Sequence, residues 1–286
     1  MNDPRPGVLL GRLHRRIRGY GARRVVVALS GGVDSSLVLA VSARALGKGA
    51  VTAITAISPS YPRGELEVAR DVSAWAGTTH RTVETAEVGK EAYARNDALR
   101  CFHCKMELYS TLRRIAEECT AGSGPAAVVL AGANADDPAD MRPGLRAAER
   151  HGVRNPLLEE GMGKDVLRSL ARSIGLPVAD KPALACLSSR VAYGVRITPE
   201  LLERIDSAER ALRVLGFDTV RIRHRGERAS IEVPAADLAR LRAHPALGGF
   251  LDEVRGLGWS RVEIDPRGYR PGSLNEELLP VSGPER

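Results

Sequence analysis

Short runs of β-branched residues alternate with helical spacings of apolar residues along the first two thirds of the chain. The run Val25–Leu29 predicts a buried parallel strand, because strands covered on both faces read as continuous apolar stretches. The stretch Ser36–Leu46 behind it has its apolar residues at helical spacing. Further strands are expected at Val51–Ile57, Thr79–Val83 and Val128–Leu130, and further helices at Glu65–Ala76, Lys105–Cys119 and Asp165–Ile174. This alternation predicts an α/β fold with a doubly wound parallel sheet.

The pattern changes after Arg190, where strands no longer alternate regularly with helices. Helices are expected at Leu201–Leu215, Ala236–Leu241 and Leu247–Gly256, and alternating strands at Thr219–His224, Ser230–Val233 and Arg261–Asp265. We therefore expect a smaller C-terminal α+β domain. The predicted organisation is a basic N-terminal arm with a short helix over residues 1–24, the α/β domain over 25–190 and the second domain over 191–286.

The net charge of +7 is concentrated in the N-terminal arm. Residues 1–24 hold seven Arg and one acidic residue, Asp3, whereas the rest of the chain is nearly neutral. A nucleic-acid-binding protein would instead carry a broad basic face, so no nucleic acid partner is expected. Only five of the 42 basic residues are Lys, which makes a Lys inside a motif informative.

Neither an export signal nor a membrane-spanning segment is expected. No apolar stretch precedes the arginines of the arm, and the longest apolar runs are far below a spanning length of about 20 residues. Four Cys in 286 residues exclude a disulfide-rich secreted scaffold. We therefore expect a cytoplasmic protein with reduced thiols and no membrane partner.

A glycine-rich loop, SGGVDSS, joins the first expected strand to the first expected helix. Its glycines allow a tight turn that presents backbone N–H groups, and the N-terminus of a helix attracts anions. The loop therefore indicates a site for a phosphate or pyrophosphate group. It is neither a Walker P-loop nor a Rossmann turn, because it lacks the residues of both motifs. Its residues are Ser30, Gly31, Gly32, Val33, Asp34, Ser35 and Ser36.

This loop closely resembles the PP-loop of the ATP pyrophosphatase superfamily. Members of that superfamily cleave ATP between its α- and β-phosphates and adenylate a substrate. The resemblance implies that residues 25–190 form a PP-loop domain and that the chain uses ATP and Mg²⁺. It leaves the substrate open.

Further segments resemble the LarE family of that superfamily, in family order along nearly the whole chain. LarE proteins convert pyridinium-3,5-biscarboxylic acid mononucleotide into its bis-thiocarboxylic counterpart, which later becomes the nickel-pincer nucleotide of lactate racemase. The resemblance implies an ATP-dependent sulfur transferase with this small-molecule substrate. It also implies a homo-oligomer, since LarE relatives assemble as hexamers. The segments are Arg100–Lys105, Gly132–Gly144, Arg154–Gly161, Asp180–Arg190, Tyr193–Thr198 and Gly268–Glu276, and they contain Lys105, Asn134, Asn155 and Lys181.

Three cysteines fall in these segments, with Cys101 and Cys104 in a CxxC motif and Cys186 far along the chain. A CxxC occurs in redox pairs, zinc sites and iron–sulfur sites alike. Three thiolates without a fourth suit a [4Fe–4S] cluster with one open iron. The set of three resembles the LarE branch that is thought to deliver sulfur from such a cluster, whereas chains with the Cys186 equivalent alone sacrifice its sulfur. Cluster delivery is our hypothesis, and sacrifice of Cys186 or a structural metal site is the alternative.

The resemblance further implies that ATP lies on the SGGVDSS loop, with Mg²⁺ held in part by Asp34 and by an acidic residue of the DDPAD segment, residues 136–140. A substrate carboxylate would attack the α-phosphate, and sulfur from the cluster or from Cys186 would then attack the acyl-adenylate. Lys105 and Arg190 are candidates for neutralising phosphate and carboxylate charge. The loop after Val128–Leu130 is expected to close over the nucleotide or substrate, a solvated surface turn being the alternative. Its polar side chains are Asn134, Asp136, Asp137, Asp140 and Arg142.

Arginines of the second domain form another candidate site. Arg221 and Arg223 lie on one expected strand and Glu232 on the next, and together they are candidates for binding a substrate phosphate. The alternative is a row of alternating charges on an exposed strand face.

Three other functions stay open: a PP-loop tRNA thiolase, an ATP-dependent amide-forming synthetase and a non-catalytic nucleotide-binding module. The near-neutral body and the low content of Phe and Trp argue against an RNA substrate. An amide-forming enzyme needs none of the three cysteines, and the intact loop argues against a non-catalytic module.

Overall fold

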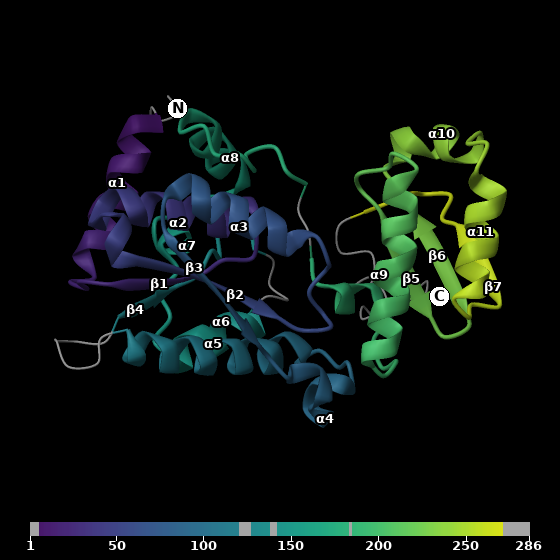
Figure 1. Ribbon diagram of the computed structural model, residues 1–286, viewed down its shortest axis with the longest axis horizontal. Coiled ribbons are helices and arrows are strands. Elements are labelled where there is room, and N and C mark those ends of the chain that lie inside the picture. The colour runs from purple at the N-terminus through teal and green to yellow at the C-terminus, as the bar shows by residue number, and fades with distance from the viewer. Residues whose placement is uncertain (1–5, 120–126, 138–141, 183–184, 271–286) are drawn as a thin grey trace, which may run out of the picture. The chain divides into compact units, whose positions relative to one another are not determined.

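A computed structural model describes residues 6–119, 127–137, 142–182 and 185–270 of the chain. The chain divides into two compact units, drawn in Figure 1. The first unit comprises Met1–Glu87 and Cys101–Leu184, and the second comprises Val88–Arg100 and Ala185–Arg286. The expected division at residues 24 and 190 into an arm and two domains stays a prediction.

The first unit is built on a parallel sheet of four strands in the order β3-β2-β1-β4. The predicted strands and the α/β fold class are confirmed. From β1 the chain runs outward through β2 to β3, and it then returns to place β4 on the other side of β1. Open α/β sheets bind ligands at such a reversal, beside the carboxyl ends of the strands. The strands are β1 (Val25–Ala28), β2 (Val51–Ile57), β3 (Thr79–Glu84) and β4 (Val128–Leu130).

Successive residues of the strands face two different apolar cores. Val25 and Val27 lie in one core, and Val26 and Ile54 lie in the other. Helices cover both faces of the sheet (Figure 1), which explains why the runs of β1 and β4 are continuously apolar. The first core contains residues of α1 (Pro6–Gly19), α2 (Val33–Leu46), α3 (Glu65–Ala76), α7 (Pro156–Glu159) and α8 (Lys164–Ser173), and the second contains residues of α5 (Arg100–Glu118) and α6 (Arg142–Arg150).

Two helices begin earlier than their apolar spacing predicts. Helix α2 begins at Val33 instead of Ser36, and α5 begins at Arg100 instead of Lys105. The apolar spacing that predicts these helices begins further along each of them, behind the turns that carry the glycine-rich loop and the CxxC motif, so it misses the first turns. Short 3₁₀ helices follow α2 and β3, at Lys48–Ala50 and Glu87–Gly89. No helix in the described parts of the chain is both long and apolar enough to cross a membrane.

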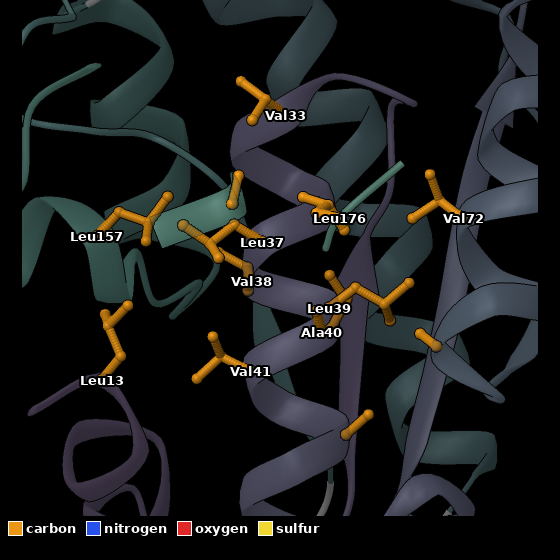
Figure 2. Close-up of a cluster of buried hydrophobic side chains, with 14 of the residues drawn as sticks. Leu13, Val33, Leu37, Val38, Leu39, Ala40, Val41, Val72, Leu157 and Leu176 are labelled. Atoms are coloured by element: carbon orange, nitrogen blue, oxygen red, sulfur yellow. The ribbon is translucent and has the colours of Figure 1, made fainter. Parts of the chain in front are cut away.

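Helix α2 is the centre of the first core. Its side chains are buried on nearly every side, and Leu37 and Leu39 are fully buried. Figure 2 shows apolar residues of α2 pointing in several directions, toward Leu13, Val72 and Leu157 of other elements. The glycine-rich loop thus leads directly into the most deeply buried helix of the unit. The packing of this helix fixes the position of the loop.

The second unit contains a sheet of three strands in the order β5-β6-β7. Strands β5 and β6 are antiparallel, and β6 and β7 are parallel. Helix α9 begins behind Thr198, whose side chain accepts a hydrogen bond from the backbone N–H of Leu201, and it packs on β5. The smaller α+β fold is confirmed. Its elements are α4 (Glu91–Ala94), a 3₁₀ helix at Leu187–Arg190, α9 (Pro199–Val214), β5 (Arg221–Arg225), β6 (Arg228–Glu232), a 3₁₀ turn at Ala235–Asp237, α10 (Leu238–Arg242), α11 (Leu247–Gly256) and β7 (Arg261–Ile264).

Candidate functional site

The glycine-rich loop lies at the carboxyl end of β1 and leads directly into α2. Gly31 has a φ of 80°, a left-handed conformation that favours glycine. The loop is closed by Ser35, whose Oγ accepts a hydrogen bond from the backbone N–H of Ser30 at 3.2 Å and donates to the carbonyl of Gly32 at 3.2 Å. Ser36 is fully buried, and its Oγ has no hydrogen-bond partner. This arrangement places backbone N–H groups and hydroxyls at a helix N-terminus, as a phosphate site requires.

The segment behind β4 touches this loop. A Cβ atom at Gly132 would lie 2.7 Å from the backbone nitrogen of Ser35 and 2.9 Å from its Cα. Only glycine allows so close an approach of two backbones. The carboxyl ends of β1 and β4 therefore share one site, as the strand order predicts.

Three polar side chains from these two segments form one hydrogen-bonded group. Asn134 is 1% exposed, and its Nδ2 donates to Asp34 Oδ2 at 3.1 Å and to Asp137 Oδ1 at 3.2 Å. Asp137 also accepts the backbone N–H of Asn134 at 2.9 Å. The alternative of a plain solvated turn is wrong for this part of the loop, because its central amide is buried against Asp34.

The carboxyl groups of this cluster influence each other. The pKa of Asp137 is raised, chiefly because burial disfavours the charged carboxylate. The negative charge of Asp34 adds to the rise, while hydrogen bonds from Asn134 and the charge of Lys164 oppose it. Asp34 Oδ1 is buried and has no hydrogen-bond partner. Two carboxylates with an oxygen left unsatisfied fit Mg²⁺, which takes one or two carboxylates together with substrate phosphates.

Lys164 is a site residue that the sequence reading misses. It begins α8, and its ammonium group forms an ion pair with Asp34. Its backbone N–H donates to Asp136 Oδ2 at 2.5 Å, and Asp136 in turn donates its own N–H to Asn134 Oδ1 at 2.9 Å. The scarcity of lysine in the chain is the sequence signal that marks this residue.

Lys181 lies against the other part of the glycine-rich loop. Its Nζ donates to the carbonyl oxygen of Gly31 at 3.2 Å and pairs with Glu65 Oε2 at 2.5 Å. The scarcity of lysine marks this residue too, and the structure brings it to the site. Glu65 belongs to no sequence motif and is found only through its contacts.

The CxxC motif and Lys105 lie at the start of α5. Cys101 and Cys104 are separated by three positions, so they share one face of its first turn, and both are half-buried. The ammonium of Lys105 lies 5.7 Å from the centre of the Tyr109 ring. Cys119, just behind the helix, packs against the second core, as expected for a structural cysteine.

Cys186 belongs to the second unit, directly before the 3₁₀ helix Leu187–Arg190. Its carbonyl oxygen accepts hydrogen bonds from Ser189 Oγ at 2.8 Å and from the Arg190 guanidinium at 3.0 Å. Within the described ranges, no three His, Cys, Asp or Glu side chains form a metal-binding group. The iron–sulfur cluster therefore stays a proposal.

Arg190 is fully buried, and its guanidinium is surrounded by partners of the protein itself. It forms a bidentate ion pair with Glu209, at 2.8 and 3.1 Å. It also donates to the carbonyl of Ala185 at 2.5 Å. These contacts give Arg190 the geometry of a residue that fixes the backbone around Cys186.

The three candidate residues of β5 and β6 are buried, so the alternative of an exposed charged face is wrong for them. Arg221, Arg223 and Glu232 are 2%, 5% and 1% exposed. Arg223 pairs with Glu232 at 2.9 Å and donates to the Ser189 carbonyl at 2.7 Å. Burial lowers the pKa of Arg221 to about 10, and the charge of Arg190 contributes. Burial also raises the pKa of Glu232.

Two candidate residues of the loop after β4 lie beyond this group. Asp140 is outside the described residues, as is the side chain of Arg142, whose backbone begins α6. The first unit thus brings together Ser30–Ser36, Asn134, Asp136 and Asp137, and adds Lys164 and Lys181.

Comparison with known proteins gives matches along most of the chain. The asparagine synthase family model matches residues 14–136. An uncharacterised protein of Synechocystis sp. is 41% identical over 255 residues, which is 89% of this chain and 93% of the relative. The pyridinium-3,5-bisthiocarboxylic acid mononucleotide synthase of Lactiplantibacillus plantarum is 34% identical over 263 residues, 90% of each chain. An uncharacterised protein of Methanocaldococcus jannaschii is 27% identical over 176 residues, 62% of this chain and 66% of the relative.

Proposed function

The chain belongs to the LarE family of PP-loop ATP pyrophosphatases, which makes it an ATP-dependent enzyme, and we propose that it converts the carboxylates of pyridinium-3,5-biscarboxylic acid mononucleotide into thiocarboxylates. The relative from Lactiplantibacillus plantarum bears the name of the synthase that forms this bisthiocarboxylic product. In the proposed role, the product goes on to the nickel-pincer nucleotide of lactate racemase.

The first proposed step is adenylation of a substrate carboxylate. A carboxylate oxygen attacks the α-phosphorus of ATP, the bond from this phosphorus to the bridging oxygen breaks, and pyrophosphate leaves with the electron pair. The loop Ser30–Ser36 binds the phosphates through its backbone N–H groups at the start of α2. The carboxylate gains AMP as a leaving group, which makes its carbon open to attack.

We assign Mg²⁺ binding to Asp34, with Asp137 as the second carboxylate. The orphaned Oδ1 of Asp34 supports this assignment, as does the pairing of two acidic side chains through Asn134. Bound Mg²⁺ would neutralise charge on the phosphates as pyrophosphate leaves. Lys105 is proposed to neutralise further phosphate or carboxylate charge.

In the second proposed step, a sulfur nucleophile attacks the acyl carbon and AMP leaves with the electrons of the broken C–O bond. We propose that Cys101, Cys104 and Cys186 hold a [4Fe–4S] cluster, which would supply the sulfur. The shared helix face of Cys101 and Cys104 supports this, since two thiols there point to one side. The alternative is that Cys186 gives up its own sulfur.

In the second unit, we propose that Arg221 and Arg223 serve the phosphate of the substrate, with Glu232 orienting Arg223. We propose a positioning role for Arg190 in place of direct charge neutralisation. Its contacts with Glu209 and with the carbonyls of Ala185 and Cys186 support that role. A homo-oligomer, hexameric as in LarE relatives, is part of the proposal and is checked by analytical ultracentrifugation.

The observation that carries the proposal is the contact of Asp34 with Asn134 beside the SGGVDSS loop, in a chain of this family. The test is incubation with ATP, Mg²⁺ and the biscarboxylated nucleotide, followed by measurement of pyrophosphate and mass analysis of the product. Asp34→Asn is expected to lower pyrophosphate release by about a hundredfold or more, as expected for loss of a metal-binding, charge-stabilising group. Asp165→Asn, an exposed acidic change in α8, is the control and keeps the activity. Pyrophosphate release that depends on RNA or on an amine donor instead would contradict the proposal.

A further inference from the structure

Lys164 occupies a position that the proposed reaction does not yet explain. Its ammonium is paired with the same carboxylate, Asp34, that is proposed to bind Mg²⁺. Asp34 Oδ2 also accepts the amide of Asn134 at 3.1 Å, so two donors converge on one oxygen. The question is what a lysine does on a carboxylate that a divalent cation needs.

The protein fixes the backbone of Lys164 firmly at this place. Asp136 accepts its N–H at 2.5 Å, a favourable position for a carboxylate at the start of α8. The neighbouring Ala135 donates its N–H to the carbonyl of Met162 at 3.0 Å. At Gly163, a Cβ atom would lie 2.5 Å from the carboxylate of Asp136. Three close approaches thus join the loop after β4 to the start of α8. They fix the backbone of Lys164 in the position from which its side chain reaches Asp34.

The side chain itself keeps freedom to move. It is 37% exposed, whereas that of Asp34 is 19% exposed. A lysine ammonium is a compact charge on a flexible stem with four methylene groups, so it can change partner while its backbone stays in place. The fixed backbone therefore favours the contact with Asp34, and the flexible side chain allows that contact to break.

An ammonium and a magnesium ion compete for a carboxylate, because both need its oxygen lone pairs and their positive charges repel each other. Repulsion between charges a few ångströms apart is substantial where water is partly excluded. Lys164 pairs with Oδ2 of Asp34, whereas the unpartnered Oδ1 is the oxygen assigned to Mg²⁺, so both cations would share one carboxylate. Each cation therefore weakens the binding of the other, and the ion pair loosens when the metal binds.

We propose that Lys164 is a positioning residue that holds Asp34 in the empty site, passes it to Mg²⁺ when the metal–nucleotide arrives, and then pairs with a phosphate oxygen. The inference rests on the proposed ATP site. It gives Lys164 two roles: it keeps free metal out of a site that lacks nucleotide, and it adds a positive charge to the phosphates once the metal is in place. Lysine is a common point-charge partner of phosphate.

The test is Mn²⁺ binding to the nucleotide-free full-length protein, followed by electron paramagnetic resonance. Lys164→Met and Lys164→Gln are expected to bind Mn²⁺ about tenfold more tightly than the unchanged protein, because removing a nearby cation favours the metal. A merely structural lysine would not raise metal affinity when removed. Lys164→Arg keeps the charge, so its Mn²⁺ binding is expected to stay as weak as that of the unchanged protein. The double change Asp34→Asn with Lys164→Met is expected to lose the gain in Mn²⁺ affinity. Lys48→Met, at an exposed lysine of the first unit, is the matched control and should change nothing.

A second measurement tests the partner change. Binding of a non-cleavable ATP analogue with Mg²⁺ is expected to weaken about tenfold in Lys164→Met, since a charge-assisted contact to phosphate is lost. Unchanged or weaker Mn²⁺ binding by both Lys164→Met and Lys164→Gln, or unchanged analogue binding, would overturn the inference. Neither measurement involves the sulfur acceptor. Failure of the proposed function would therefore appear as absent product with Mn²⁺ and analogue binding as predicted, and failure of the inference would appear in the Mn²⁺ titration or in analogue binding, whatever the product.

Discussion

At the scale of single residues, the ion pair of Arg190 and Glu209 is the most deeply buried charge contact in the second unit. Both side chains are fully buried, and Glu209 also pairs with Arg213 at 2.9 Å and accepts the backbone N–H of Ile222 at 3.2 Å. Burial opposes ionisation of Glu209, but the charge and hydrogen bonds of Arg190, helped by Arg221 and Arg213, hold its pKa below the ordinary value. The folded protein therefore keeps this carboxylate ionised to a lower pH than the unfolded chain does.

Glu209→Gln is expected to lower the free energy of unfolding by about 3–5 kcal/mol at neutral pH, because it leaves the Arg190 charge buried without its carboxylate. The folded pKa of Glu209 is the lowered one, so its contribution is present above the unfolded pKa and is lost as pH falls through the folded value. Urea unfolding at several pH values checks this. The difference in the free energy of unfolding between the unchanged protein and Glu209→Gln should become smaller in acid. Glu203→Gln, a half-exposed residue on the same helix, is the control. A free-energy difference that stays constant down to strongly acidic pH would contradict a lowered folded pKa for Glu209.

At the scale of elements, the meeting of the segment after β4 with the glycine-rich loop depends on Gly132. Gly132→Ala is expected to weaken ATP binding and to lower the free energy of unfolding by about 1–3 kcal/mol, because the new methyl group meets the Ser35 backbone, which cannot move aside as a side chain can. Nucleotide titration and urea unfolding measure the two effects. Gly49→Ala has open space around its Cβ position and is the matched control. Equal nucleotide affinity in both variants would show that the close approach is unimportant.

The strands of the first unit could be predicted from the sequence almost to the residue, most clearly β1, whose Val25–Val27 run is covered on both faces and leaves a continuous apolar signal. The turns that build the site were harder to predict from the sequence. The apolar spacing that predicts α5 comes from Leu108, Leu112 and Ile115, behind the turn that carries the CxxC, so it places the helix start too late. Helix α6 was missed for a similar reason, because it is short and dominated by Arg and Ala.

Side-chain partners were less predictable than elements. Alternating charges on β5 and β6 suit an exposed face equally well, and only the packed structure distinguishes that face from the buried Arg223–Glu232 pair. Lys164 and Asp34 are far apart in sequence, and their contact depends on the return of the chain to the edge of β1. The loop motif identifies one half of the candidate site, whereas the lysines and Glu65 that meet it come from tertiary structure.

At the scale of the whole molecule, the N-terminal arm is part of the first core. Helix α1 buries Leu9, Leu13 and Ile17 against the core that contains α2, while Arg12 and Arg16 on another side pair with Glu160. Four of the seven arginines of residues 1–24 therefore lie on a packed amphipathic helix, whose apolar face is part of the core.

Leu13→Ala is expected to lower the free energy of unfolding by about 2–5 kcal/mol, since the leucine is 1% exposed and its removal leaves a cavity. Thermal or urea unfolding checks this. Val8→Ala on the same helix, at a residue that is 55% exposed, should change stability by no more than about 0.5 kcal/mol. Similar small effects in both variants would mean that α1 contributes little to the stability of the unit.

The source of the sulfur is the prediction that involves both units, because Cys101 and Cys104 belong to one and Cys186 to the other. Under cluster delivery, protein reconstituted without oxygen contains iron and acid-labile sulfide, completes several turnovers and keeps its intact mass. Cys101→Ala should then lose both the iron and the repeated turnover, while Cys119→Ala, a change at the packed cysteine, should keep them. Iron and sulfide analysis with intact-mass spectrometry checks these outcomes. If Cys186 is sacrificed instead, the chain loses the elements of H₂S, turnover stops after its thiol is spent, and Cys101→Ala is as active as the unchanged protein.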